Sequence, residues 1–269
     1  IGAKFERDIE PGEVVVIRRG RLRSLRPMAR SAEERFCIFE YIYFARPDSN
    51  LMNHNVYAFR KELGRSLARE YPVPADMVVP VLDSGTAAAL GYAEEEGIPY
   101  ETALIRNHYV RRTFIEPAQS IRNFGVKVKH NAIRSFLEGK RIVLVDDSIV
   151  RGTTLIKIVA MLRSSGAREV HVRISSPPSI GPCHYGIDTP TQAELIAAQH
   201  TSDEICEIIG ADSLGYLSLP GLRNAAEHEL KRGICDGCFS GEYPIPVEAE
   251  REVPQLSLFR AIEDEPETS

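Results

Sequence analysis

One stretch constrains this chain more than any other: residues 141–155 read "RIVLVDDSIVRGTTL". An apolar run, typical of a parallel strand buried on both faces, ends in the adjacent carboxylates Asp146 and Asp147. A short loop with a hydroxyl, an arginine and a glycine follows, and two threonines open a helical pattern. The order strand, loop, helix predicts one βα unit of a largely parallel α/β sheet flanked by helices.

The same alternation recurs along the chain. Residues 76–85, "DMVVPVLDSG", predict a buried strand that ends in a loop at Asp83-Ser84-Gly85 and leads into a helix closed by Gly97. Further strands are expected at 99–107 and 169–178, and helices at 53–71, 153–167 and 191–211. Residues 1–25 predict two short strands around a Pro11-Gly12 turn.

The acidic pair and its loop indicate a ligand class. Ligands of open α/β sheets bind outside the carboxyl ends of the strands, where Asp146 and Asp147 fall. A helix N-terminus with nearby hydroxyls suits a phosphate, and two carboxylates suit ribose hydroxyls and a divalent cation. The P-loop pattern GxxxxGK[ST] is absent. The chemistry therefore indicates a phosphorylated sugar, and the alternative is a solvated acidic pair before a threonine-capped helix.

Composition excludes two classes of partner. The 269 residues carry a net charge of −5 without a basic block, which argues against nucleic-acid backbones. No run of 18 apolar residues occurs, so a transmembrane helix is not expected. The five cysteines are odd in number, and the chain shows no secretory signal, so a disulfide framework is disfavoured. Cys235 and Cys238 form a C-x₂-C pair that, with other thiols, suits zinc or an iron–sulfur cluster.

Residues 141–155 as a whole resemble the phosphoribosyl pyrophosphate (PRPP) signature of type I phosphoribosyltransferases. Other segments resemble the glutamine PRPP amidotransferases in particular: 37–49, 98–134, 177–190, 209–222 and 235–244. This resemblance implies a type I phosphoribosyltransferase fold over residues 29–245. It also implies that residues 1–28 are a β remnant and linker of a glutaminase domain and that 246–269 are an acidic tail.

The resemblance implies a reaction as well. Ammonia released from glutamine displaces pyrophosphate from PRPP and gives 5-phosphoribosylamine, the first committed step of purine synthesis. The family's glutaminase half begins with a catalytic cysteine, and this chain begins Ile-Gly-Ala-Lys. We therefore expect the synthase half alone, able to use free ammonia but not glutamine. Purine-nucleotide feedback inhibition, a homotetramer and a cytoplasmic location are also implied.

The family's site residues map onto matching positions here. Asp146 and Asp147 would serve the ribose hydroxyls and Mg²⁺, and Ser84 stands in a metal-binding position. The pyrophosphate loop would be Asp83, Ser84 and Gly85, after Leu82 where the family commonly has proline. The residues expected around the 5-phosphate are Ser148, Ile149, Val150, Arg151, Gly152, Thr153 and Thr154.

Two further features follow from the resemblance. Residues 109–131 would be a flexible loop that closes over PRPP, with Arg112 and Lys129 reaching the pyrophosphate. Arg111 and His130 replace a usual glycine and leucine there, which puts loop closure in question.

A subgroup of the family holds a [4Fe–4S] cluster on cysteines that match Cys37, Cys183, Cys235 and Cys238. We expect a structural cluster at these four positions. Cys206 is surplus and is expected in the core.

Two other functions share the opening motif. A nucleobase salvage phosphoribosyltransferase would use the same loop, although the additional amidotransferase motifs and the cysteine set argue against it. A non-catalytic PRPP-sensing regulator would keep the loop for binding alone. Such proteins usually need a nucleic-acid surface, and the sequence has no helix-turn-helix signal or basic stripe.

Overall fold

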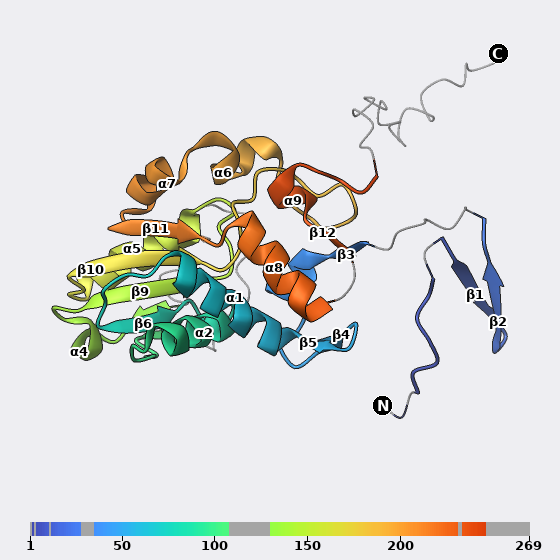
Figure 1. Ribbon diagram of the computed structural model, residues 1–269, viewed down its shortest axis with the longest axis horizontal. Coiled ribbons are helices and arrows are strands. Elements are labelled where there is room, and N and C mark those ends of the chain that lie inside the picture. The colour runs from blue at the N-terminus through green and yellow to red at the C-terminus, as the bar shows by residue number, and fades with distance from the viewer. Residues whose placement is uncertain are drawn as a thin grey trace, which may run out of the picture.

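A parallel sheet organises the fold of the computed structural model, which describes residues 2, 4–10, 12–27, 35–107, 130–230 and 233–245 (Figure 1). The strand order is β11-β10-β9-β6, and every neighbouring pair is parallel. The bounds are β6 Met77–Pro80, β9 Arg141–Asp146, β10 Glu169–Ile174 and β11 Ser213–Tyr216. The predicted parallel α/β sheet is confirmed.

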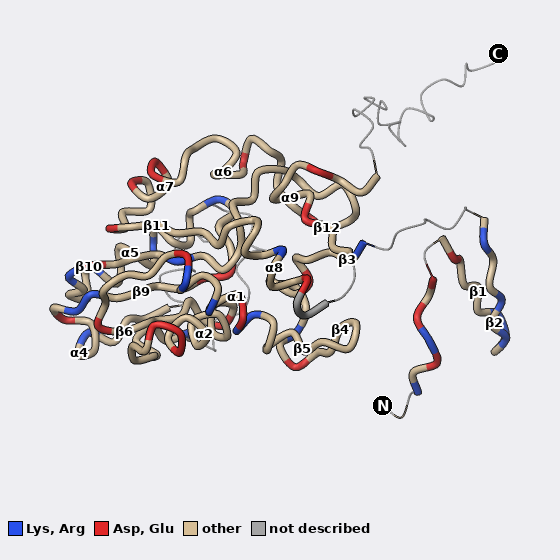
Figure 2. Tube along the Cα trace, in the orientation of Figure 1, with Lys and Arg blue, Asp and Glu red and all other residues tan. Residues whose placement is uncertain are grey.

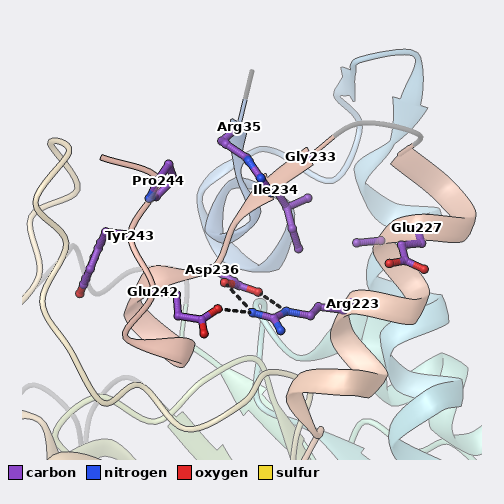
Figure 3. A pocket seen from close by; sticks show the side chains of 10 residues that line it. Arg35, Arg223, Glu227, Gly233, Ile234, Asp236, Glu242, Tyr243 and Pro244 are labelled. Carbon is purple, nitrogen blue, oxygen red and sulfur yellow. Dashed lines mark hydrogen bonds and ion pairs between the residues drawn. The ribbon is translucent and has the colours of Figure 1, made fainter. Parts of the chain in front are cut away.

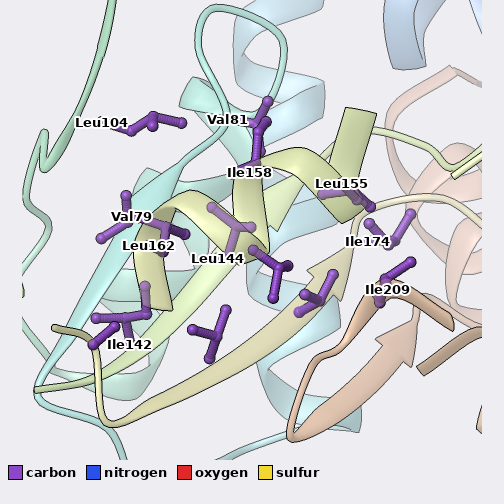
Figure 4. Packing of buried hydrophobic residues seen from close by; sticks show 14 of the residues in the cluster. Val79, Val81, Leu104, Ile142, Leu144, Leu155, Ile158, Leu162, Ile174 and Ile209 are labelled. Atoms are coloured by element: carbon purple, nitrogen blue, oxygen red, sulfur yellow. The ribbon is translucent and has the colours of Figure 1, made fainter. Parts of the chain in front are cut away.

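Alternating side chains of β9 build the two halves of the core. Val143 and Val145 pack with α1 (Val56–Glu70), α2 (Thr86–Glu96) and α8 (Leu219–Leu230). Ile142 and Leu144 face the other way and pack with α5 (Thr153–Ser164) and α7 (Ser202–Ile209), as Figure 4 shows. Because successive strand residues point to opposite faces, a strand covered on both sides is apolar throughout.

Helices α1 and α2 cross in very close contact. A Cβ atom at Gly64 of α1 would lie 1.9 Å from the carbonyl oxygen of Ala88. A Cβ atom at Gly91 of α2 would lie 1.9 Å from the carbonyl oxygen of Lys61. Glycine at both positions lets the two backbones approach to a distance that no other residue permits. This packing fixes α2, and with it the loop that precedes α2.

Several short elements surround the sheet. β7 (Leu104–Arg106) pairs antiparallel with β8 (His130–Ala132), and β4 (Asn50–Leu51) with β5 (His54–Asn55). The strand expected at 99–107 is thus shorter, and only a bridge from Tyr100 to Val78 joins this segment to the main sheet. β3 (Arg35–Cys37) pairs parallel with β12 (Gly233–Cys235). The remaining short helices are η1 Glu40–Phe44, a π-helix, α4 Arg134–Leu137 and α9 Gly237–Ser240.

The helix expected over 191–211 is broken into three pieces: η3 (Gln192–Glu194), α6 (Ile196–Gln199) and α7. Two capping boxes set the starts of the first and last pieces: Thr191 pairs with Glu194 before η3, and Thr201 with Glu204 before α7. A capping threonine sits outside the helix that it begins, so each T-x-x-E starts a new helix. The helical character predicted for this segment is confirmed, and its division into pieces was not predicted.

The N-terminal strands form a hairpin that Figure 1 shows apart from the layered body. β1 (Val14–Arg18) pairs with β2 (Arg21–Leu25), and Arg18, Arg21 and Arg23 make the hairpin basic (Figure 2). The two strands are joined by the turn at Arg19-Gly20, with Gly20 at φ 72°. A turn is also present at Gly12, where the Glu13 N–H donates to the Glu10 carbonyl at 2.9 Å, but it precedes both strands, so the expectation that it lies between them was wrong. Among the helices that the structure describes, none has the length and apolar character needed to cross a bilayer.

Candidate functional site

Three chain segments meet at the carboxyl ends of β6, β9 and β10. Val81, just after β6, donates its N–H to the Val145 carbonyl at 2.8 Å, and Ser175, just after β10, donates to that of Asp146 at 3.0 Å. These bonds bring the loops after the three strands against the end of β9. This is the place where ligands of parallel sheets bind.

The acidic pair lies at the centre of this edge and is buried, with Asp146 7% and Asp147 5% exposed. Oδ1 of Asp146 accepts hydrogen bonds from Ser84 Oγ at 3.0 Å and from the Asp147 N–H at 2.9 Å. The Ser148 hydroxyl donates to Asp147. Burial, and then the charge of Asp147, raise the pKa of Asp146 well above its usual value. Burial likewise raises the pKa of Asp147. Burying two negative charges side by side costs free energy unless a cation or hydrogen-bond donors lie close to them. The pair is therefore suited to bind a cation or the donor groups of a ligand.

A buried arginine supplies positive charge that acts on Asp147. Arg60 of α1 is 6% exposed and donates to the carbonyl oxygens of Tyr41 at 2.6 Å and Ala45 at 2.9 Å, at the end of η1. Burial lowers the pKa of Arg60, and the charge of Asp147 opposes that shift. In return Arg60 holds down the pKa of Asp147. The sequence reading missed Arg60, although a charged residue beside Phe59 and Leu63 on the apolar face of α1 was a usable signal.

The loop after β9 presents a helix N-terminus. Gly152 takes φ 74° at the N-cap of α5, a left-handed conformation that favours glycine. Thr153 and Thr154 are exposed at the first turn, and Ile149 is buried. The Val150 carbonyl accepts the Ile196 N–H at 2.9 Å, and Arg151 pairs with Glu194 at 2.9 Å. The loop is therefore anchored from outside, and its backbone and hydroxyl donors face the acidic pair's edge of the sheet.

The loop after β6 lies against the same edge. Its Leu82–Asp83 peptide bond is cis, and Asp83 forms an ion pair with Arg106 at the end of β7. A Cβ at Gly85 would lie 2.2 Å from the Val145 carbonyl oxygen, so only glycine lets this loop approach β9. That approach places Ser84 within hydrogen-bonding distance of Asp146.

The four cysteines expected to act together are brought together by the fold. Cys37 and Cys235 are direct partners in the β3–β12 pairing, and the Cys238 carbonyl accepts the N–H groups of Ile180 and Gly181 at 2.9 and 3.1 Å, just before Cys183. Burial raises the pKa of Cys238 to about 12, with further contributions from Cys37, Cys235 and Cys183.

The thiols nevertheless do not converge on one point. Within the described residues, no group of three or more His, Cys, Asp or Glu side chains is arranged to hold a metal ion. Cys206 lies on α7 apart from this group, and it is half-buried instead of fully in the core.

Comparison with known proteins agrees with this geometry. Residues 52–175, which include both loops and the acidic pair, match the family model of the phosphoribosyl transferase domain. The chain is 52% identical to an amidophosphoribosyltransferase of Archaeoglobus fulgidus over 251 residues, which are 93% of this chain and 55% of that protein. It is 49% identical to that of Bacillus subtilis over 259 residues, or 95% of this chain and 54% of the relative. The chain belongs to the amidophosphoribosyltransferase family.

Solved structures support the same relation. A glutamine PRPP amidotransferase from B. subtilis, solved with ADP and GMP, superposes with a TM-score of 0.79 at 51% identity over 92% of this chain and 55% of the other. The described fold is thus the type I phosphoribosyltransferase fold. The chain spans about half the length of the amidophosphoribosyltransferases that it matches.

Part of the family pattern lies outside the described residues. Arg111, Arg112 and Lys129, most of the expected flexible loop at 109–131, and the tail at 246–269 are among them. The end of that expected loop is described, and it is ordered: His130 and Asn131 belong to β8, and His130 is 4% exposed. The loop prediction was therefore too long by these two residues.

Proposed function

We propose that this chain is the PRPP-binding half of an amidophosphoribosyltransferase and transfers ammonia to PRPP. Pyrophosphate would leave and 5-phosphoribosylamine would form, in the first committed step of purine synthesis. The observation that carries the proposal is the buried Asp146–Asp147 pair, which lies between two anchored loops at the end of a parallel sheet. Family membership supports the same activity.

The residues of the proposed site would bind the parts of PRPP and stabilise the charge that develops during the reaction. Asp146 and Asp147 would hold the ribose hydroxyls, residues 148–154 the 5-phosphate, and Asp83-Ser84-Gly85 the pyrophosphate. Departure of pyrophosphate leaves positive charge on the ribose ring, and the fixed carboxylates beside the ring would stabilise it. Arg112 and Lys129, outside the described residues, would contact the leaving group and exclude water.

The donor set suits Mg²⁺. Asp146, Asp147 and Ser84 offer hard oxygen ligands, and a bound cation would offset the cost of burial that raises the pKa of each carboxyl. Mg²⁺ binds in such sites through one or two carboxylates together with ligand phosphates. Bound there, it would neutralise charge on the diphosphate.

The cysteines suit a [4Fe–4S] cluster better than a single ion. A mononuclear zinc needs four ligand atoms about 2.0–2.3 Å from one centre, whereas a cluster takes one thiolate on each of four separated irons. Cys37 and Cys235 are strand partners and the pKa of Cys238 responds to Cys37, Cys235 and Cys183, so the four thiols are neighbours, although the described residues contain no group of three arranged to hold a metal ion. When bound, the cluster would cross-link the three chain segments that carry these thiols.

Four further properties are part of the proposal. The B. subtilis relative was solved with ADP and GMP, so purine nucleotides are proposed as feedback inhibitors of this chain. A glutaminase half is the proposed source of ammonia, with residues 1–28 as its remnant. A homotetramer and a cytoplasmic location are expected from the family.

The test is turnover of the 269-residue chain with PRPP and Mg²⁺, measured as pyrophosphate release. We expect release with ammonium and none with glutamine. Release with adenine, guanine or hypoxanthine in place of ammonium would instead indicate a salvage enzyme. PRPP binding without release under any condition would indicate the sensing regulator. An Asp147→Asn variant is the negative control for contaminating activity.

A further inference from the structure

The segment after α9 crosses over the cysteine group. Residues 241–245 follow α9, the helix that carries Cys238, and are bonded at both ends; Figure 3 shows the contact of Glu242 with Arg223. Glu242 lies 3.5 Å from Arg223 of α8, which also binds Asp236 at 2.7 Å. At the other end the Tyr185 hydroxyl accepts the Ile245 N–H at 3.0 Å and donates to the Ile245 carbonyl at 2.7 Å. The segment is thus held as a strap between α8 and the loop that carries Cys183.

Tyr243 is the residue of this strap that reaches inward. Its hydroxyl donates to the Pro182 carbonyl at 2.6 Å, next to Cys183, and its ring lies edge-on to His184 with centroids 4.8 Å apart. The same ring covers Gly237, between Cys235 and Cys238: a Cβ there would lie 2.6 Å from ring atom Cδ1. Tyr243 therefore contacts both segments that bring Cys183 to the C-x₂-C pair.

A pocket of about 440 Å³ adjoins the outer side of the strap (Figure 3). Glu242, Tyr243 and Pro244 line it on one side, and Arg223 and Asp236 on another. Asp236, between Cys235 and Cys238, lines the pocket directly, and the Tyr243 ring packs on the neighbouring Gly237, so the ring covers one side of the turn that carries the two cysteines.

We infer that Tyr243 shields the group formed by Cys37, Cys183, Cys235 and Cys238, keeping water-borne reagents from the thiols and from any iron they hold. Gly237 is glycine because a side chain there would displace the shielding ring. The statement about thiols needs only the described geometry, whereas the statement about iron rests on the proposed cluster.

The experiment compares Tyr243→Ala and Tyr243→Phe with the unaltered chain. In reduced, metal-free protein, the iodoacetamide reaction of each cysteine is followed by mass spectrometry. We expect Tyr243→Ala to speed the reaction of Cys183 and Cys238 about tenfold, because loss of the ring exposes further these two half-buried cysteines. Tyr243→Phe keeps the ring and should change these rates less than about twofold.

Two controls separate shielding from general loosening of the fold. Cys206, on α7, is an internal standard whose rate should not change, and Tyr57→Ala removes an exposed tyrosine of α1 far along the chain from the strap. An unchanged rate at Cys183 and Cys238 in Tyr243→Ala, or an equal rise at Cys206, would overturn the inference.

Gly237→Ala tests the shielding by Tyr243 independently. It can be used even if Tyr243→Ala folds poorly. It should expose the thiols in the unaltered background, and it should add nothing in a Tyr243→Ala background, where no ring remains to be displaced. Additive effects of the two changes would contradict the assigned contact.

Iron-loaded protein provides the second readout: the rate at which a chelator removes iron, followed by visible absorbance. Tyr243→Ala should speed this loss about tenfold if opening controls access. Absence of iron from the purified chain would show that the proposed cluster is wrong. The alkylation rates of the thiols would then decide whether Tyr243 shields them. Iron that is lost at the same rate with and without Tyr243 would defeat the shield alone.

Discussion

The Ser84 hydroxyl donates a 3.0 Å hydrogen bond to Oδ1 of Asp146, which lies 62 positions farther along the chain. This bond joins the loop after β6 to the acidic end of β9. It depends on Gly85, whose missing side chain lets the first loop reach the second. The proposed pyrophosphate loop and the proposed ribose site are therefore one structural unit.

Asp146→Asn should stabilise the ligand-free chain while it abolishes PRPP turnover. Burial and Asp147 raise the pKa of Asp146, so its charged form destabilises the fold at neutral pH. That cost disappears as the pH falls through the raised pKa. Without Mg²⁺ we expect a Tm about 2–4 °C higher than that of the unaltered chain at pH 7.5, or about 1 kcal/mol.

The gap in Tm should close as the buffer is made more acidic, because the unaltered carboxyl then becomes neutral as well. Calorimetry at a series of pH values checks this. A variant that is less stable than the unaltered chain at pH 7.5 would contradict it. Asp76→Asn is the opposite control, since hydrogen bonds from Arg141 lower the pKa of Asp76 and its charged form is stabilising.

Arg60→Met should lower both stability and affinity for Mg²⁺ with PRPP. The change leaves the Tyr41 and Ala45 carbonyls without their donor and removes positive charge near Asp147. Each lost bond costs about 1–3 kcal/mol when the acceptor stays buried. Arg60→Lys should recover part of the affinity, because the charge remains.

Urea unfolding and calorimetric titration measure these two effects. The matched control is Arg65→Ala on the same helix, where a half-exposed arginine pairs with Glu62 and Glu94 and should contribute less than about 1 kcal/mol. Equal losses for Arg60→Met and Arg65→Ala would refute the special role of Arg60.

Gly64→Ala should destabilise the chain by about 2 kcal/mol, from overpacking against α2. The sign of this change in stability is informative, because replacing glycine by alanine in an exposed helix interior stabilises the helix by about 1 kcal/mol. The added methyl would lie 1.9 Å from the Ala88 carbonyl oxygen, and backbone cannot move aside as a flexible side chain can. The urea midpoint of Gly64→Ala, beside that of Ser66→Ala on the same helix, measures the effect; a gain in stability would show that the helices separate freely.

Cys238→Ser should remove bound iron and the visible absorbance of the chain, whereas Cys206→Ser should leave both unchanged. Only the first thiol belongs to the group of four. Iron and sulfide analysis of protein purified without oxygen provides the measurement. Stoichiometric zinc without iron in the unaltered chain would show that the cluster assignment is wrong.

The sequence predicted best where local signals agreed with each other. For β9 and α5 the apolar run, the acidic pair, the glycine loop and the helical period all pointed to one βα unit, and the structure confirms it. At 191–211 the apolar pattern alone indicated one helix, and the threonine caps that divide it were overlooked. Caps are local chemistry, so that error was avoidable.

Other features were beyond local reasoning. Nothing near Cys37 shows that β3 pairs with β12, because that contact depends on the whole intervening fold. The role of Arg60 likewise depends on η1, whose π-helical end supplies the carbonyl acceptors. For the cysteines the resemblance to a family, and not periodicity, carried the information about the site, whereas for Arg60 the resemblance carried none.

The pairing of β3 with β12 has a consequence for biosynthesis. Its two strands lie near opposite ends of the described fold, so Cys37 leaves the ribosome long before Cys235, Cys238 and Tyr243 have been translated. The parallel sheet can form first, since its last strand ends at Tyr216. If the proposed cluster binds all four thiols, it can load only after the last segment is made, and a truncated nascent chain would fold its sheet without that centre.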